Sequence, residues 1–269
     1  MKPPLNKDTQ VCISLASRPS NIGTRFHNYL YEQLGLDFIY KACTTTDIVA
    51  AIGGVRALGI RGCSVSMPFK QDVLLLADHI DDSALAIDAV NTIVNEGGTL
   101  TAANTDYIAV QQLIAGLDPS SNVLIRGSGG MASAVGTAFR DTGFQHGTIV
   151  ARNKESGAAL ADQLGYTWTS EVAGVRAAVI VNVTPIGMSG PDECELSFTE
   201  DQIAAADTVF DVVALPSETP LIVAARAAGK SVITGAEVIA LQAAEQFERY
   251  TGVRPAAEQI AAASAFSRA

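Results

Sequence analysis

The sequence is poor in basic side chains. Its 269 residues hold 18 Lys and Arg against 28 Asp and Glu, a formal net charge of -10. Such a charge disfavours a nucleic acid or an anionic membrane as the partner, so we expect neither. No apolar run approaches the ~18 residues of a membrane span, and the N-terminal MKPPLNKDTQ lacks a signal-like apolar stretch, so we expect a soluble, cytoplasmic protein.

The sequence also lacks grouped cysteines and histidines. Its 4 cysteines and 3 histidines lie far apart, and no C-x-x-C pair occurs. This scatter excludes the usual patterns of a zinc site or a disulfide framework. We therefore expect no metal, and we expect free, buried thiols.

Strand-like and helix-like segments alternate along the first hundred residues. They read VCISLA, TRFHNYLYEQLGL, DFIYKAC, TDIVAAIGGVRALGI and GCSVSMP, and in NTIVNEGGTLTAANTD the Gly97-Gly98 pair predicts a hairpin turn. Alternation of this kind predicts an α/β fold with a largely parallel sheet covered on both faces. With 48% hydrophobic residues, the chain can fill the cores of two domains.

The second domain begins near the helix predicted at YIAVQQLIAGL. After the linker DPSSN, the segment NVLIRGSGGMASAVGTAFRDTGF predicts a strand, a glycine turn and a helix, and GTIVARN predicts the next strand. Together they form a βαβ unit of the usual ~30 residues. We therefore predict an N-terminal substrate-binding α/β domain over 1–103, completed by 238–269, and a Rossmann-type dinucleotide-binding domain over 104–237.

The glycine turn predicts a nucleotide site. Gly127, Gly129 and Ala132 fit G-x-G-x-x-A between a strand and a helix. The first glycine permits a tight turn, the second lets the backbone approach a pyrophosphate, and the helix start attracts its charge. A plain glycine turn is the structural alternative.

The following strand indicates which dinucleotide binds. An NAD site places an acid about 20 residues after the glycines, whereas this chain has ARNK at 151–154. Arg152 can pair with a 2'-phosphate through its planar fork, and Lys154 adds charge, so we predict NADP. The alternative is a solvated surface arginine.

Lys70 follows the strand-like GCSVSMP, where Pro68 ends the ladder because it has no N–H donor. Ligands of α/β folds bind beyond the carboxyl ends of the strands, so Lys70 is a candidate proton-transfer residue of a dehydrogenase. Asn91 and Asp106 lie in polar elements beside other strand ends and can share the site. The alternatives are a surface role for Lys70 and an N-cap role for Asp106, for a helix that begins at Tyr107.

Taken together, these motifs resemble those of the shikimate dehydrogenase family along nearly the whole chain. SVSMPFK is similar to the family's N-V-T-x-P-x-K, DAVNT to G-A-V-N-T, and ANTD to D-N-T-D. GSGGMA matches the glycine loop, ARN the N-R-T element, NVTPIGM the N-x-T-x-x-G-M element, and IALQAAEQFERYTG the closing helix. The motifs also occur in the family's order.

The resemblance implies an NADP-dependent oxidoreductase that transfers hydride reversibly between the nicotinamide and a cyclic hydroxy acid, either shikimate with 3-dehydroshikimate or a related pair. It implies Lys70 and Asp106 as the catalytic pair. The implied substrate contacts are Asn21, Gly23, Ser66, Asn91 and Gln242. The implied cofactor contacts are Gly127, Ser128, Gly129, Gly130, Met131, Ala132, Arg152, Asn153, Lys154, Thr184 and Gly235.

Some positions depart from the family pattern. In RPSNIGTRFHN, which corresponds to H-S-x-S-P-x-x-H-N, Asn21 and Gly23 replace the two serines that hold the substrate carboxylate, and Ala214 replaces a substrate-binding tyrosine. In these changes the chain resembles the shikimate dehydrogenase-like branch of the family. We therefore expect that shikimate binds weakly or is turned over slowly. The alternatives are a dehydrogenase of a different polyol acid and a non-catalytic regulatory protein that binds NADP and a metabolite. We expect a monomer or a homodimer.

Overall fold

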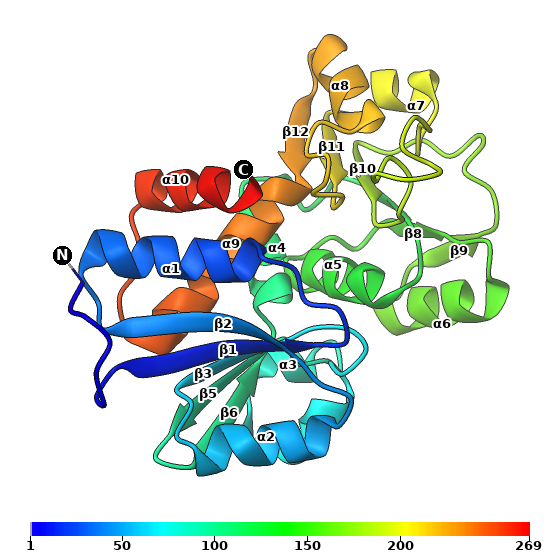
Figure 1. Ribbon diagram of the computed structural model, residues 1–269. Coiled ribbons are helices and arrows are strands. Elements are labelled where there is room, and N and C mark those ends of the chain that lie inside the picture. The colour runs from blue at the N-terminus through cyan, green and yellow to red at the C-terminus, as the bar shows by residue number, and fades with distance from the viewer. Residues whose placement is uncertain (1) are drawn as a thin grey trace. The chain divides into compact units, whose positions relative to one another are not determined.

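The computed structural model describes residues 2–269, and the chain divides into two compact units. The first unit comprises Met1–Ile108 and Ala240–Ala269, and the second comprises Ala109–Ile239. Both crossings from one unit to the other occur inside helices, α4 (Thr105–Ile114) and α9 (Gly235–Thr251) (Figure 1). The predicted α/β fold class is confirmed.

The first unit is built on a six-stranded sheet in the order β2-β1-β3-β5-β6-β4. The pairs of β1 with β2 and β3, and of β4 with β6, are parallel, whereas β5 is antiparallel to both of its neighbours. The predicted hairpin joins β5 to β6. The elements are β1 (Gln10–Ala16), α1 (Ile22–Leu34), β2 (Phe38–Thr44), α2 (Ile48–Ala57), β3 (Gly62–Val65), η1 (Asp72–Leu76), β4 (His79–Ile80), α3 (Asp82–Leu85), β5 (Thr92–Glu96), β6 (Thr99–Ala103) and α10 (Ala257–Arg268).

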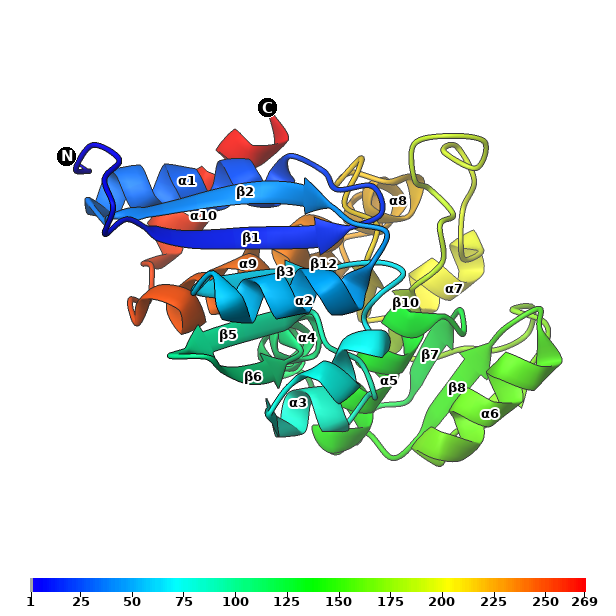
Figure 2. The ribbon, with the colours of Figure 1, turned by 60° about the horizontal axis from the view of Figure 1, so that its bottom comes forward.

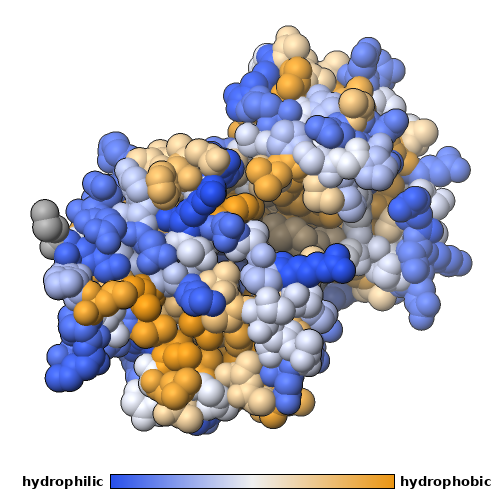
Figure 3. Space-filling model, in the orientation of Figure 1, coloured by the Kyte–Doolittle hydropathy of each residue, from blue (hydrophilic) through white to orange (hydrophobic). Residues whose placement is uncertain are grey.

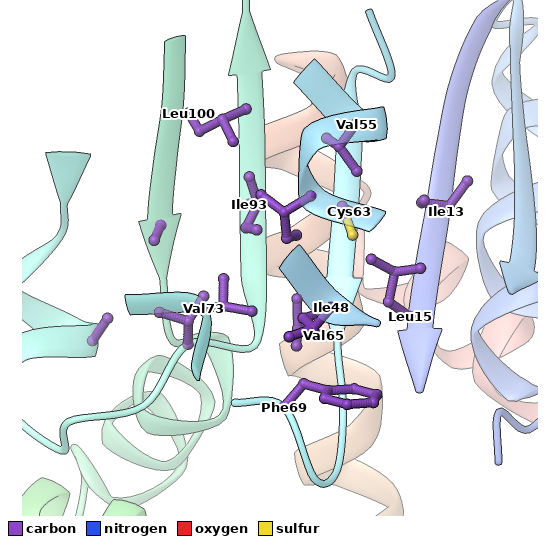
Figure 4. Close-up of a cluster of buried hydrophobic side chains, with 14 residues drawn as sticks. Ile13, Leu15, Ile48, Val55, Cys63, Val65, Phe69, Val73, Ile93 and Leu100 are labelled. Carbon is purple, nitrogen blue, oxygen red and sulfur yellow. The ribbon is translucent and has the colours of Figure 1, made fainter. Parts of the chain in front are cut away.

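The two faces of this sheet have separate hydrophobic cores. On one face, apolar side chains of β1, β3, β5 and β6 pack under α2, as Figure 4 shows for Ile13, Cys63 and Ile93. On the other face, side chains such as Cys12 and Tyr40 pack against aromatic residues of α1 and α9. The alternation of side chains along each strand divides them between the two cores.

The second unit contains a parallel six-stranded sheet in the order β12-β11-β10-β7-β8-β9. Helices α5 and α6 lie in front of β7 and β8 in Figure 2, and α7 and α8 contribute apolar residues to another core of the unit. The elements are β7 (Val123–Arg126), α5 (Gly130–Asp141), β8 (Gly147–Val150), α6 (Lys154–Leu164), β9 (Thr167–Thr169), β10 (Val179–Asn182), α7 (Glu200–Ala205), β11 (Thr208–Asp211), α8 (Pro220–Ala227) and β12 (Ser231–Thr234).

Two local predictions are corrected by the structure. The strand predicted to reach Met67 ends at Val65. The alternative in which Asp106 caps a helix that begins at Tyr107 is also wrong, because α4 begins at Thr105 and the Asn104 side chain accepts the Tyr107 N–H at 3.1 Å. Since Asn104 satisfies that free N–H group, Asp106 is not needed as the N-cap.

The first unit carries apolar surface. In Figure 3 this surface gathers where Figure 1 draws β1, β2 and α2. Val49 in α2 and Leu58 directly after it are 63% and 78% exposed. Within the described chain, no helix has the length and apolar character needed to span a bilayer.

Candidate active site and cofactor cavity

Lys70 and Asp106 form an ion pair in the first unit. Lys70 lies in the loop after β3, and its backbone is fixed because the Val90 N–H donates to the Lys70 carbonyl at 2.7 Å. Asp106 lies in the first turn of α4. The Lys70 Nζ and Asp106 Oδ2 atoms are 2.6 Å apart, and the two side chains are 31% and 17% exposed. The pair is therefore partly buried yet reachable from solvent, as proton exchange with a bound hydroxyl requires.

Asn91 is held in one orientation beside this pair. Its Oδ1 atom accepts hydrogen bonds from the Thr92 hydroxyl at 2.8 Å and from both the N–H and the hydroxyl of Thr105 at 2.8 and 3.1 Å. Three donors around one oxygen fix which end of the amide is which. The other end of the Asn91 amide, its N–H groups, is thereby also fixed in direction.

Gln242 lies on α9 and extends the same network. Its Oε1 atom lies 3.3 Å from the Thr105 hydroxyl oxygen, whose one hydrogen is shared with Asn91 Oδ1. One turn further along the helix, the Gln246 Nε2 donates to the Thr92 hydroxyl at 3.0 Å. Thr92, Thr105 and Gln246 are buried residues that the sequence analysis did not select. Little in the sequence indicated a role for these residues, because Thr and Gln occur at many positions that have no function.

The remaining predicted substrate residues lie at two chain turns. Ser66 is exposed just beyond β3. Asn21 is the N-cap residue of α1, but its side chain caps no N–H group, and Gly23 lies in the first turn of the same helix. Neither Asn21 nor Gly23 has a hydroxyl group. The two hydroxyl donors of the family's serine pair are therefore absent at the start of α1.

A cavity of about 1000 Å³ lies in the second unit at the carboxyl ends of β7, β8 and β10. Its volume suits a large organic ligand. It is lined by the predicted residues Gly127, Ser128, Gly129, Arg152, Asn153 and Thr184, and also by Arg126, Val150, Ala151, Ser170, Val172, Val183, Pro185, Ile186, Asp192, Glu195 and Leu196.

The glycine turn suits an anion. Gly127 has a φ of 129°, and a Cβ there would lie 2.7 Å from a methyl group of Val183, so only glycine fits. Gly129 is the N-cap of α5 and offers no side chain to its first N–H groups. These free donors, at the positive end of a helix of 12 residues, favour a phosphate.

Two arginines lie close together in this cavity. Burial and the charge of Arg152 lower the pKa of Arg126, and the Arg126 guanidinium also donates to the Ser197 carbonyl. The sequence analysis selected Arg152 but missed Arg126. The available signal was a charged residue directly before the first glycine, at the end of an otherwise apolar strand.

Other predicted cofactor residues do not line the cavity. These are Gly130, Met131, Ala132, Lys154 and Gly235. Ala132 is buried, and Lys154 is exposed at the start of α6. At Gly235 a Cβ would lie 2.3 Å from the Val212 carbonyl oxygen, so backbone packing alone requires glycine. Asn153 lines the cavity and also caps α6 by accepting the Ser156 N–H.

The residues at these sites do not form a metal centre. Within residues 2–269, no three His, Cys, Asp or Glu side chains are grouped as metal ligands would be. Lys70 and Asp106 place an amine and a carboxylate beside further hydrogen-bond donors and acceptors, and the second unit has a cavity lined by two arginines and a glycine turn.

The sequence of this chain is similar to sequences of known proteins. The family model of the shikimate dehydrogenase substrate binding domain matches residues 21–93. A shikimate dehydrogenase-like protein of Haemophilus influenzae is 55% identical over 267 residues, covering 98% of both chains. A shikimate dehydrogenase (NADP(+)) of Pelodictyon phaeoclathratiforme is 34% identical over 85% of this chain and 86% of its own.

A solved structure supports the same relationship. Shikimate 5-dehydrogenase from Thermus thermophilus, in complex with NADP(H) and shikimate, has a TM-score of 0.85 at 26% identity. The match covers 96% of this chain and 99% of that chain. The fold and the site define a Rossmann-type oxidoreductase family. The chain belongs to the shikimate dehydrogenase family, which confirms the resemblance found in the motifs.

Proposed function

We propose that this protein is an NADP-dependent dehydrogenase that interconverts a cyclic hydroxy acid and its ketone. The observation that carries the proposal is the Lys70–Asp106 pair at 2.6 Å, beside the oriented amide of Asn91. Relatives named as NADP(+) shikimate dehydrogenases support the cofactor and the substrate class. In this proposal the first unit binds the substrate and the second binds the dinucleotide.

The residues of the second unit fit NADP. The turn at Gly127 and Gly129 would hold the pyrophosphate, and Arg152 would pair with the 2'-phosphate. NADP, when bound, would supply the hydride acceptor. Thr184 lines the same cavity, and its hydroxyl is oriented by a 2.6 Å hydrogen bond to Asn182 Oδ1.

The residues of the first unit would handle the substrate. Lys70 as the neutral amine would accept the hydroxyl proton during oxidation, and as the ammonium group it would return the proton during reduction. Asp106 would orient the Lys70 side chain in both forms and hydrogen-bond a neighbouring hydroxyl. Asn91 and Gln242 would bind further hydroxyls through their amide groups. A base held by a charged partner is placed for the reaction before the substrate arrives.

The substrate departs from shikimate in this proposal, or shikimate is used poorly. Asn21, Gly23 and Ala214 remove hydroxyl groups that the family pattern uses for binding. We therefore expect shikimate to have a high KM or a low kcat. A micromolar KM with fast turnover of shikimate would contradict this part of the proposal.

The test is a screen of cyclic hydroxy acids and their ketones with NADP and NAD, followed by absorbance of the reduced nicotinamide. We expect turnover that falls about 10²- to 10⁴-fold in Lys70→Ala, with an almost unchanged Kd for NADP. Asp106→Asn should lose activity as well. The double variant should lose less than the product of the two single losses, because the two groups act together.

The same measurements separate an enzyme from a regulatory protein. NADP binding without turnover of any compound would favour a sensor. Turnover that survives in Lys70→Ala would contradict the role given to this lysine.

A further inference from the structure

Hydroxyl side chains lie in register across three strands of the first sheet. Ser14 of β1 is paired with Ser64 of β3, and Ser64 is paired with Thr92 of β5. Paired residues of adjacent strands point to the same face of a sheet. That face is the one covered by α1 and α9, because Cys12, two residues before Ser14, packs in their core. A row of hydroxyl side chains therefore crosses the face that α1 and α9 cover.

Tyr40 adds a further hydroxyl to this row. It is paired with Cys12, so its side chain lies on the same face. The Tyr40 and Ser64 hydroxyl oxygens are 2.5 Å apart. A Cβ built on Gly23 would lie 3.5 Å from the Tyr40 hydroxyl oxygen. The Tyr40 hydroxyl is thus next to the position where the family pattern has its second serine.

Tyr40 is fixed in place by its neighbours. The Asn28 side chain accepts the Tyr40 N–H at 3.0 Å and donates to the Tyr40 carbonyl at 2.7 Å. The ring stacks on His27, with centroids 4.3 Å apart and planes within 6°. Burial raises the pKa of Tyr40, so its hydroxyl keeps its proton over the working pH range. The hydroxyl is therefore a positioned donor that needs little reorganisation.

We infer that the hydroxyl groups of Tyr40 and Ser64 bind the carboxylate of the substrate in place of the hydroxyl that Gly23 lacks. This inference rests on the proposed function and specifies how its acid substrate is held. Ser64 is paired with Thr92 across β3 and β5, and the Thr92 hydroxyl donates to Asn91 at 2.8 Å, so the anchor lies on the same pair of strands as the amide proposed for the ring hydroxyls.

The number of free hydroxyl hydrogens limits how tightly Tyr40 and Ser64 can bind a carboxylate. Tyr40 has side-chain hydrogen bonds with both Ser64 and Ser14, so two of the three hydroxyl hydrogens are used within the row and one is left for the ligand. Two independent serines would offer two. An anchor of this kind holds a carboxylate more weakly than the family's serine pair, in agreement with the weak use of shikimate expected from the sequence.

The test compares Tyr40→Phe and Ser64→Ala with Tyr250→Phe, using shikimate as the probe. Tyr250 is a matched control because its buried hydroxyl belongs to the same aromatic core and has no hydrogen-bond partner in the described chain. We expect the first two variants to raise the KM and the calorimetric Kd for shikimate about 5- to 20-fold, with kcat changed less than about twofold. The control should change neither constant.

The second part of the test is a variant that should bind shikimate more tightly. A Cβ at Gly23 makes only ordinary contacts with Tyr40, so Gly23→Ser should fold normally. It should lower the Kd for shikimate by restoring a hydroxyl. The inference is overturned if Tyr40→Phe leaves KM and Kd unchanged, or if the unmodified protein does not bind shikimate at millimolar concentration. Binding that weakens in Tyr40→Phe, with no turnover of any compound, would support the anchor and refute the proposed dehydrogenase.

Discussion

Individual charged residues determine how favourably an anion binds in the cavity of the second unit. Arg126 and Arg152 line it together with the acids Asp192 and Glu195. An anion entering the cavity gains from the arginines and loses from the acids. Cofactor selection therefore depends on where the extra phosphate lies relative to each charge, and a count of charges does not decide it.

The role of Arg152 can be measured directly. Arg152→Ala should weaken NADP binding about ten- to a hundredfold and NAD binding much less, because a charge-assisted contact to the 2'-phosphate is lost. The Kd of each cofactor is the measurement. Lys154→Ala is the control, since this lysine lies outside the cavity lining, and it should have the smaller effect. Equal losses of both cofactors in Arg152→Ala would exclude a role in phosphate recognition.

His27 gives the stability of the protein a pH dependence. Burial lowers the pKa of His27 to about 3, although nearby Gln246 acts in the opposite direction. The unfolded chain binds a proton near the ordinary value of about 6.5, so stability falls as the pH decreases from there toward 3. The slope is about 1.4 kcal/mol per pH unit for this residue.

The test replaces the imidazole with an apolar ring. In His27→Phe, the free energy of unfolding should fall less steeply between about pH 6 and pH 4.5, by about 1.4 kcal/mol per unit. Urea unfolding at several pH values gives the slope. His146→Gln, which removes an exposed histidine, is the control for the loss of an imidazole elsewhere in the chain. An unchanged slope in His27→Phe would mean that His27 takes up its proton in the folded state.

The sequence predicts residues that stand in a local motif better than residues that act through the fold. Lys70 and Asp106 were selected because each follows or adjoins a strand end. Their separation of 2.6 Å depends on how the loop after β3 meets α4, and no local pattern contains that. Tyr40 was not selected, because on a strand it is indistinguishable from a core aromatic until Gly23 and Ser64 are seen beside it.

At the scale of elements, the outer strand β2 is protected from further pairing. It is the edge of the first sheet and pairs only with β1 among the described strands. Side chains of α1 bond its outward backbone groups: Asn28 binds the N–H and carbonyl of Tyr40, and Thr24 accepts the Ala42 N–H at 3.2 Å. An edge satisfied in this way is a poor template for another strand.

Asn28→Ala should therefore destabilise the protein. It leaves two backbone groups of Tyr40 without partners in a half-buried place, at a cost of about 2 to 4 kcal/mol. The free energy of unfolding from urea titration is the measurement. Asn21→Ala is the matched control, because the Asn21 side chain forms no cap hydrogen bond in the same helix. A loss below about 0.5 kcal/mol would show that solvent replaces the Asn28 contacts.

Elements were predictable where the hydrophobic pattern was long. The strand, glycine turn and helix from β7 to α5 appear where the sequence placed them, because apolar residues and glycines mark each boundary. The two-residue strand β4 was not predictable, since it is too short to show alternation. Beyond the end of β3, the Ser66 N–H still donates to the Leu15 carbonyl at 2.9 Å, so the sequence pattern could not show where the regular strand stops.

At the scale of the whole molecule, the chain folds into two units that each have their own sheet and core. The sequence indicated two domains through its two sets of alternating segments. Each crossing from one unit to the other lies within a continuous helix, and no linker marks it. Two separate cores permit the units to respond separately to ligands.

Hydrogen exchange with NADP tests this separation and the proposed division of labour. A ligand at 100 times its Kd stabilises the structure that binds it by about 2.7 kcal/mol, which slows exchange of the most protected amides about a hundredfold. With NADP alone, we expect this slowing in β7, β8 and β10. The amides of β1, β3 and β5 should slow much less until a substrate is added.

The result of this experiment depends on whether the two units unfold together or separately. If the two units opened only together, NADP would slow the strands of both sheets by the same factor, and the assignment of the dinucleotide to the second unit alone would have no support from exchange. Arg152→Ala at the same NADP concentration is the control. Its protection should shrink in β7, β8 and β10, because the stabilisation is RT ln(1 + [NADP]/Kd) and a larger Kd makes this term smaller. Protection that appeared first in β1, β3 and β5 would reverse the assignment of the units.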